Sequence, residues 1–97
     1  MQDKRQDPRI LLEDRPHVSL VSDDRKLSAV LLDISASGAR IKLPPSEVLP
    51  SVGSEIIVQY PALPMLDKRK ASVIWGKGIH FGVRFTERID VGSIGDL

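Results

Sequence analysis

Two arginines four positions apart, Arg5 and Arg9, are the first side chains whose type and spacing favour binding chemistry. Pro8 lies between them and restricts Asp7 to an extended conformation, so the two guanidinium groups project from a stiffened arm rather than from a helix. The planar guanidinium fork binds phosphate through paired hydrogen bonds, bonds guanine O6 and N7 together and stacks on a base. The alternative interpretation is a polar arm whose arginines are solvated.

A second polar cluster, Asp-Ile-Ser-Ala-Ser-Gly at residues 33–38, follows a largely apolar segment. If the strand continues, Asp33 and Ser35 point to the same face, where the carboxylate can accept from guanine N1–H and N2–H and the hydroxyl can meet a base edge or a phosphate. Gly38 permits either a positive φ or a close backbone approach. The alternative interpretation is an ordinary turn in which Asp and Ser bond their own backbone.

The elements that must carry these residues are short segments in which apolar and polar residues alternate. This period-2 pattern predicts strands and no long helix. It also predicts that Ala71, Val73 and Trp75 share one face. Six strands at roughly ten-residue spacing indicate an all-β fold, a small antiparallel barrel or sandwich, and a closed barrel would remove exposed edges. The predicted strands lie in residues 18–20, 27–34, 39–43, 56–60, 71–75 and 79–85.

Composition excludes several classes of protein. Lys and Arg total 14 against 13 Asp and Glu, so the net charge of +1 and the aromatic content of 4% argue against a nucleic-acid coat. The absence of cysteine excludes disulfides, a thiol nucleophile and a Cys-ligated metal site. No apolar run approaches the roughly 20 residues of a membrane span, and the N-terminus lacks the apolar region of a secretion signal. We therefore expect a cytoplasmic domain.

The chain divides into three parts. Residues 1–15 carry four charges of each sign and little apolar surface, so we expect a flexible N-terminal arm. Residues 16–86 contain the six strands of the barrel, and residues 87–97 form a short C-terminal tail.

The two polar motifs, taken together in this order with 23 residues between them, resemble the PilZ family of cyclic di-GMP receptors. The resemblance covers most of the chain and implies a six-stranded antiparallel barrel with a flexible N-terminal arm and little or no helix. One departure is the segment 86–97, which is shorter than the C-terminal helix of many members. The matching segments are the two motifs, Gly-Ala-Arg-Ile at 38–41, Leu-Pro-Pro at 43–45, Val-Ile-Trp at 73–75 and Phe-Gly-Val-Arg-Phe at 81–85.

The resemblance also implies the roles of individual residues. Arg5 and Arg9 would clamp guanine edges and phosphates, Asp33 and Ser35 would engage the second guanine on the barrel surface, and Gly38 would close the second motif. Further candidates for ligand contacts are Lys4, which precedes the clamp, and Arg40, which faces outward two positions beyond Gly38.

The implied function is that of a receptor or adaptor in bacterial second-messenger signalling, such as the regulation of motility or biofilm formation, without catalytic activity or a cofactor. Because 97 residues leave no room for an effector domain, the output would pass through an unidentified effector protein. We expect no DNA or RNA partner, no membrane insertion, no metal site, and a monomer or a weak ligand-linked dimer. His17 and His80 lie far apart and lack a third ligand.

Two alternatives to this function remain open on the sequence. One is a PilZ-fold protein–protein interaction module that does not need the nucleotide. The other is a small barrel that binds nucleic acid through Arg40, Lys42 and the cationic residues 68–70.

Overall fold

The computed structural model describes residues 10–64 and 66–89, and within these ranges it contains strands and no helix. Each of the six predicted strands is present, with ends that differ by a few residues from the alternation pattern. A seventh strand of two residues precedes them. The strands are β1 (Ile10–Leu11), β2 (His17–Ser22), β3 (Arg25–Ile34), β4 (Gly38–Lys42), β5 (Glu55–Gln59), β6 (Arg69–Lys77) and β7 (His80–Phe85).

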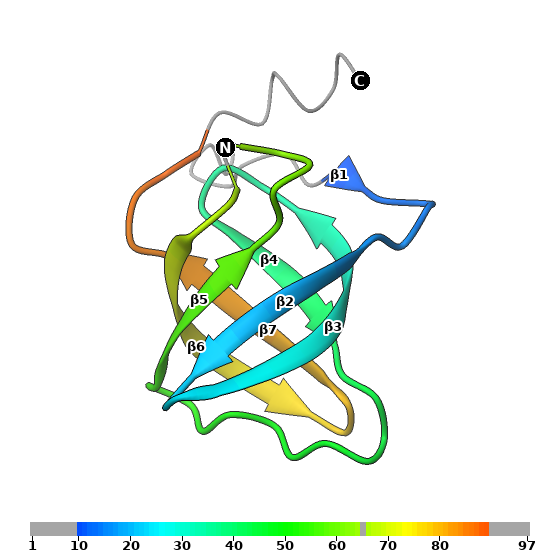
Figure 1. Cartoon of the computed structure of the whole chain (residues 1–97), viewed down its shortest axis with the longest axis vertical. Coiled ribbons are helices and arrows are strands. Elements are labelled where there is room, and N and C mark those ends of the chain that lie inside the picture. Colours follow the sequence, from blue (N-terminus) through cyan, green and yellow to red (C-terminus); the bar gives the residue numbers. More distant parts are fainter. Residues whose placement is uncertain (1–9, 65, 90–97) are drawn as a thin grey trace, which may run out of the picture.

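Strands β2 to β7 close into a six-stranded antiparallel barrel. Around the ring, β3 pairs with β2, β2 with β5, β5 with β6, β6 with β7, and β7 with β4. The pairing of β4 with β3 completes the closure. In Figure 1, β2 and β5 cross the near side of the barrel, and β4 and β7 lie behind them. The predicted all-β barrel is therefore confirmed.

The core fills the interior of this ring. Residues at alternate positions of the six strands point inward and form one apolar cluster, which includes the fully buried Leu20, Leu31, Ile41 and Phe81. Burial of a side chain of this size stabilises a fold by about 1.5–3 kcal/mol. Because the cluster draws on every strand of the barrel, it fixes which face of each strand looks outward.

Two β-bulges reverse the alternation, one in β3 and one in β6. In β3 the register steps from Leu31 to Asp33, which leaves Leu32 as the extra residue. In β6 it steps from Val73 to Trp75, which leaves Ile74 as the extra residue. An extra residue turns the next side chain to the opposite face. The prediction that Trp75 shares the inner face of Ala71 and Val73 is therefore wrong, because the bulge turns the indole outward.

Strand β1 belongs to the segment that we expected to be a polar arm, and it was not predicted as a strand. Its two residues pair with the end of β3, Ile10 opposite Ile34 and Leu11 opposite Asp33. The Leu12 amide continues this ladder by donating to the Leu32 carbonyl at 3.0 Å. The chain therefore meets the barrel wall directly beside the second polar motif.

Candidate ligand-binding site

The first motif falls in the part of the sequence that the structure does not describe. Lys4, Arg5 and Arg9 all lie outside the described residues. Arg9 is nevertheless the residue immediately before β1.

Asp33 anchors the second motif through an ion pair. Its side chain has no exposed surface, yet the bulge directs it to the outer wall, opposite Arg40 of β4. The Arg40 Nε and Nη2 atoms both donate to Asp33 Oδ2 at 2.8 Å. The Arg40 side chain keeps 46% of its surface exposed. The Asp33 carboxylate therefore fixes the orientation of the Arg40 guanidinium group, while part of the Arg40 side chain remains accessible to a ligand.

Ser35 holds the turn that joins β3 to β4. Its amide donates to the Gly38 carbonyl at 2.8 Å, and its hydroxyl accepts from the Gly38 amide at 3.2 Å. The Ser37 carbonyl accepts from the Phe85 amide at 2.7 Å, which fastens the turn to the end of β7. Ser35 thus bonds the backbone of its own turn, as the simpler interpretation expects, and Asp33 bonds the Arg40 side chain.

Gly38 is required by a close approach of two backbones rather than by a positive φ. An added Cβ would lie 2.1 Å from the Val83 carbonyl oxygen and 3.2 Å from its carbon. The φ angle of Gly38 is not in the left-handed region. Any side chain at this position would therefore force β4 away from β7 and disturb the turn that Ser35 holds.

Trp75 lies on the same outer wall, against a second glycine. It pairs with Gly82 of β7, and a Cβ added to Gly82 would lie 2.2 Å from the indole Nε1. The ring therefore rests on the bare backbone of β7, and Trp75 keeps 37% of its surface exposed. An indole held flat in this way offers an aromatic surface to a planar base.

These residues form one row across five strands, which we call the wall row. The register joins Leu11 to Asp33, Asp33 to Arg40, Arg40 to Gly82 and Gly82 to Trp75. The row combines an exposed apolar side chain, an ion-paired guanidinium and an indole. This combination suits an anionic, aromatic ligand.

Sequence reasoning missed two members of the wall row, Leu11 and Trp75. The alternation pattern places Trp75 on the same face as Ala71 and Val73. The adjacent apolar residues Ile74 and Trp75 were a signal of the bulge, since they break the alternation set by Ala71 and Val73. For Leu11 the sequence offers no comparable signal, because a two-residue strand is too short to show a period.

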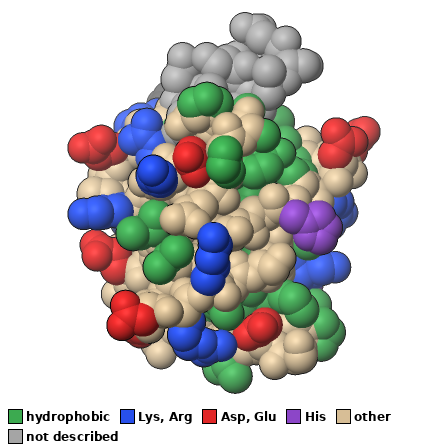
Figure 2. Space-filling model, in the orientation of Figure 1, with side chains coloured by type: hydrophobic (Ala, Val, Ile, Leu, Met, Phe, Trp, Pro, Cys, Tyr) green, Lys and Arg blue, Asp and Glu red, His purple; other side chains and the backbone are tan. Residues whose placement is uncertain are grey.

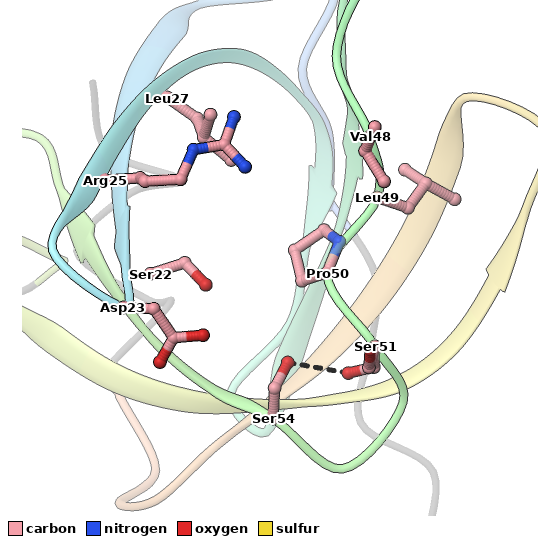
Figure 3. A pocket seen from close by; sticks show the side chains of 9 residues that line it. All are labelled: Ser22, Asp23, Arg25, Leu27, Val48, Leu49, Pro50, Ser51 and Ser54. Atoms are coloured by element: carbon pink, nitrogen blue, oxygen red, sulfur yellow. Dashed lines mark hydrogen bonds between the residues drawn. The ribbon is translucent and has the colours of Figure 1, made fainter.

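A separate hollow lies at the other end of the barrel. It has a volume of about 200 Å³ between the β2–β3 turn and the segment that leads into β5. Figure 3 shows the Arg25 guanidinium and the Ser22 hydroxyl directed into it, facing Val48 and Pro50. It holds none of the described motif residues, and its volume is below the roughly 300–1,000 Å³ of typical small-molecule sites.

Two searches of the described residues are negative. Residues 10–64 and 66–89 contain no group of three His, Asp or Glu side chains arranged to hold a metal ion. Nor does any helix within them have the length and apolarity needed to span a membrane.

A closed antiparallel barrel with an ion-paired arginine, a serine-held turn and an outward indole defines a small β-barrel binding domain. The family model described as PilZ domain matches residues 3–97, so the chain belongs to the PilZ domain family. This match confirms the resemblance found in the sequence. PilZ domains are binding domains rather than enzymes, and the family is known for binding cyclic di-GMP. No curated protein matches the chain.

Proposed function

We propose that this protein is a cyclic di-GMP receptor that binds the dinucleotide against the wall row and closes Arg5 and Arg9 over it. The ligand carries two phosphates and two guanines, which arginine recognises through paired hydrogen bonds and stacking. Arg40, held by Asp33, supplies a pre-oriented cation, and Trp75 supplies a stacking surface. Gly38 and Ser35 keep the turn between them in shape.

The observation that carries this proposal is the pairing of β1 with the second motif. Leu11 lies opposite Asp33, and Arg9 is two residues before Leu11. Arg5 is five residues before Ile10, so its Cα lies within about 17 Å of the Ile10 Cα by chain length alone. The chain between Arg5 and Ile10 is therefore long enough for both arginines to contact a ligand on the wall row when the arm folds over it.

The signal would leave the domain through an effector protein that recognises the ligand-bound arm. Ordering the arm costs about 1–2 kcal/mol of conformational entropy per residue, which must be offset by ligand contacts. Charge-assisted hydrogen bonds contribute roughly 1.5–3 kcal/mol each, and a micromolar dissociation constant requires about 8 kcal/mol in total. Several such contacts can offset the ordering cost of the arm and still give micromolar binding. This requires that both arginines contact the same bound ligand.

Isothermal titration with cyclic di-GMP at physiological salt tests the proposal. We expect low-micromolar or tighter binding by the native chain and its loss in Arg5→Ala/Arg9→Ala. The matched control is Arg25→Ala/Lys26→Ala, which removes two exposed cations at the far end of the barrel and should bind like the native chain. Absence of binding by the folded native chain would contradict the proposal and favour an interaction module that does not need the nucleotide.

Hydrogen exchange tests the closing of the arm separately from binding. At saturating ligand, amides in the first ten to fifteen residues should exchange more slowly than in the free protein. The β6–β7 hairpin at the far end serves as the internal reference. Binding with unchanged exchange in residues 1–15 would contradict the clamp while leaving the receptor intact.

A further inference from the structure

Arg84 lies on the outer wall beside the turn of the second motif. Its neighbours in β7, Val83 and Phe85, point into the core, so Arg84 points outward and is exposed. In the register it stands opposite Gly38 on one side and Ser72 on the other. Gly38, the residue of β4 opposite Arg84, has no side chain. The Arg84 side chain can therefore lie next to the turn that joins β3 to β4.

Lys70 is the nearest outward cation on the neighbouring strand. It precedes Ser72 by two positions in β6, which makes it the diagonal neighbour of Arg84, at about 7–8 Å between backbones. The Thr86 amide donates to the Lys70 carbonyl at 2.9 Å, so both side chains emerge from one continuous ladder. Below them a hollow of about 310 Å³ is lined by Lys68, Arg69, Lys70, Thr86 and Glu87.

Two acidic residues, Glu87 and Glu55, lie near Lys70. The acid in the hollow, Glu87, is already paired with Arg69 at 3.7 Å. Glu55 stands opposite Ser72, so it is the diagonal neighbour of Lys70 on the side of β6 that faces away from Arg84. Within the described part of the chain, neither Arg84 nor Lys70 makes an ion pair or a side-chain hydrogen bond. Two like charges placed diagonally repel each other, and an anion between them would relieve that repulsion.

The opposite side of the barrel provides a contrast. Figure 2 views the side crossed by β2 and β5, where basic and acidic side chains are interspersed over the surface. Arg25, at the far end, is paired with Glu47 at 3.2 Å. Within residues 10–64 and 66–89, Lys26, Lys42 and Lys77 at the far end also lack an ion pair, so Arg84 and Lys70 are set apart by their position beside the motif turn.

We propose that Arg84 and Lys70 form a phosphate-binding patch that holds one phosphate group of the dinucleotide on the barrel wall. This inference rests on the proposed function and adds to it, because it assigns part of the anion to fixed strands rather than to the arm. Arg84 can bind phosphate oxygens with its guanidinium fork, and Lys70 adds a point charge. The wall patch would then hold the ligand before the arm closes.

The test compares cyclic di-GMP affinity among single variants by isothermal titration at two salt concentrations. Arg84→Ala should weaken binding about tenfold, and Lys70→Ala about threefold, in line with the loss of a charge-assisted contact. Both should show a weaker dependence on salt than the native chain. Lys77→Ala is the control, since it removes one exposed cation from the far end of the same strand and should change affinity less than twofold.

Arg84→Lys separates ligand contact from a structural role, because it keeps the charge but loses the fork and should recover part of the affinity. Thermal unfolding of each variant checks that the barrel remains folded. If the native chain binds cyclic di-GMP and Arg84→Ala binds it equally well, the phosphate-binding patch is contradicted and the proposed function is not. A native chain that does not bind cyclic di-GMP would overturn the proposed function, and the patch with it.

Discussion

Asp33 and Arg40 form an unequal ion pair, one partner fully buried and the other half-exposed. Exposed ion pairs contribute little to stability, but a buried carboxylate that loses its cation keeps its desolvation cost. The pair therefore has two effects. It stabilises the end of β3 against β4, and it holds a guanidinium group in a fixed position on the wall row.

Arg40→Ala tests the first of these effects at the scale of one residue. We expect the free energy of unfolding to fall by about 1–3 kcal/mol, since the variant leaves the Asp33 carboxylate without the group that donates to Oδ2 twice. Urea denaturation measures the loss. Arg84→Ala removes an exposed arginine that makes no ion pair within the described residues, so it should cost less than about 0.5 kcal/mol, as surface substitutions generally do. Equal losses in the two variants would contradict the stabilising role of the pair.

The two bulges act at the scale of the element. Each inserts one residue into a strand of the barrel, Leu32 in β3 and Ile74 in β6. The first directs Asp33 outward and the second directs Trp75 outward, and the register then places both in the wall row. A bulge is a common means of re-aiming a side chain next to a functional site.

Deleting single residues from β6 tests this interpretation. Without Ile74, the strand alternates regularly from Ala71 through Val73 to an outward Trp75, so the deletion variant should fold and keep its indole emission near the native wavelength. Without Ser72, Ala71 and Val73 become neighbours and one of them must leave the core, so this variant should lose most of its stability. Thermal unfolding and fluorescence distinguish the two. Similar stability of both deletion variants would contradict the role assigned to the bulge.

The whole molecule is organised around one core, because the ring of strands closes only when β4 pairs with both β7 and β3. Several of these pairings join segments distant in sequence, such as β2 with β5. Ile89, which follows the last strand, also packs into this cluster, and its amide donates to the Ala36 carbonyl at 2.9 Å. Opening any seam of the ring would expose the common interior.

We therefore expect a single cooperative unfolding transition. Trp75 is the only tryptophan in the chain, so its fluorescence reports on the β6–β7 wall, while far-UV circular dichroism reports on all strands. The two urea-denaturation curves should coincide in midpoint and slope, as for a two-state domain. A fluorescence transition that precedes the loss of strand signal would show that the β6–β7 wall unfolds independently of the ring.

Much of this architecture could be predicted from the sequence. Alternating apolar residues indicate the strands, and closure follows from the need to cover edges in so short a chain. Alternation alone could not predict on which side of the barrel wall the Asp33 and Trp75 side chains lie. Each side chain follows a bulge, whose extra residue moves it to the opposite face of its strand. The partnership of Asp33 with Arg40 and of Trp75 with Gly82 depends on register between strands, which no local pattern specifies.

The attachment of β1 beside Asp33 has a consequence for the kinetics and strength of ligand capture. A group confined within about 17 Å of a site by a short tether has an effective local concentration on the order of tens of millimolar. In the proposed function, the arginines of the first motif would bind the ligand in an intramolecular second step, whose strength would depend on how stably β1 is paired with β3. Changes that loosen the pairing of Ile10 with Ile34 would lower the avidity for ligand without touching any group that contacts it.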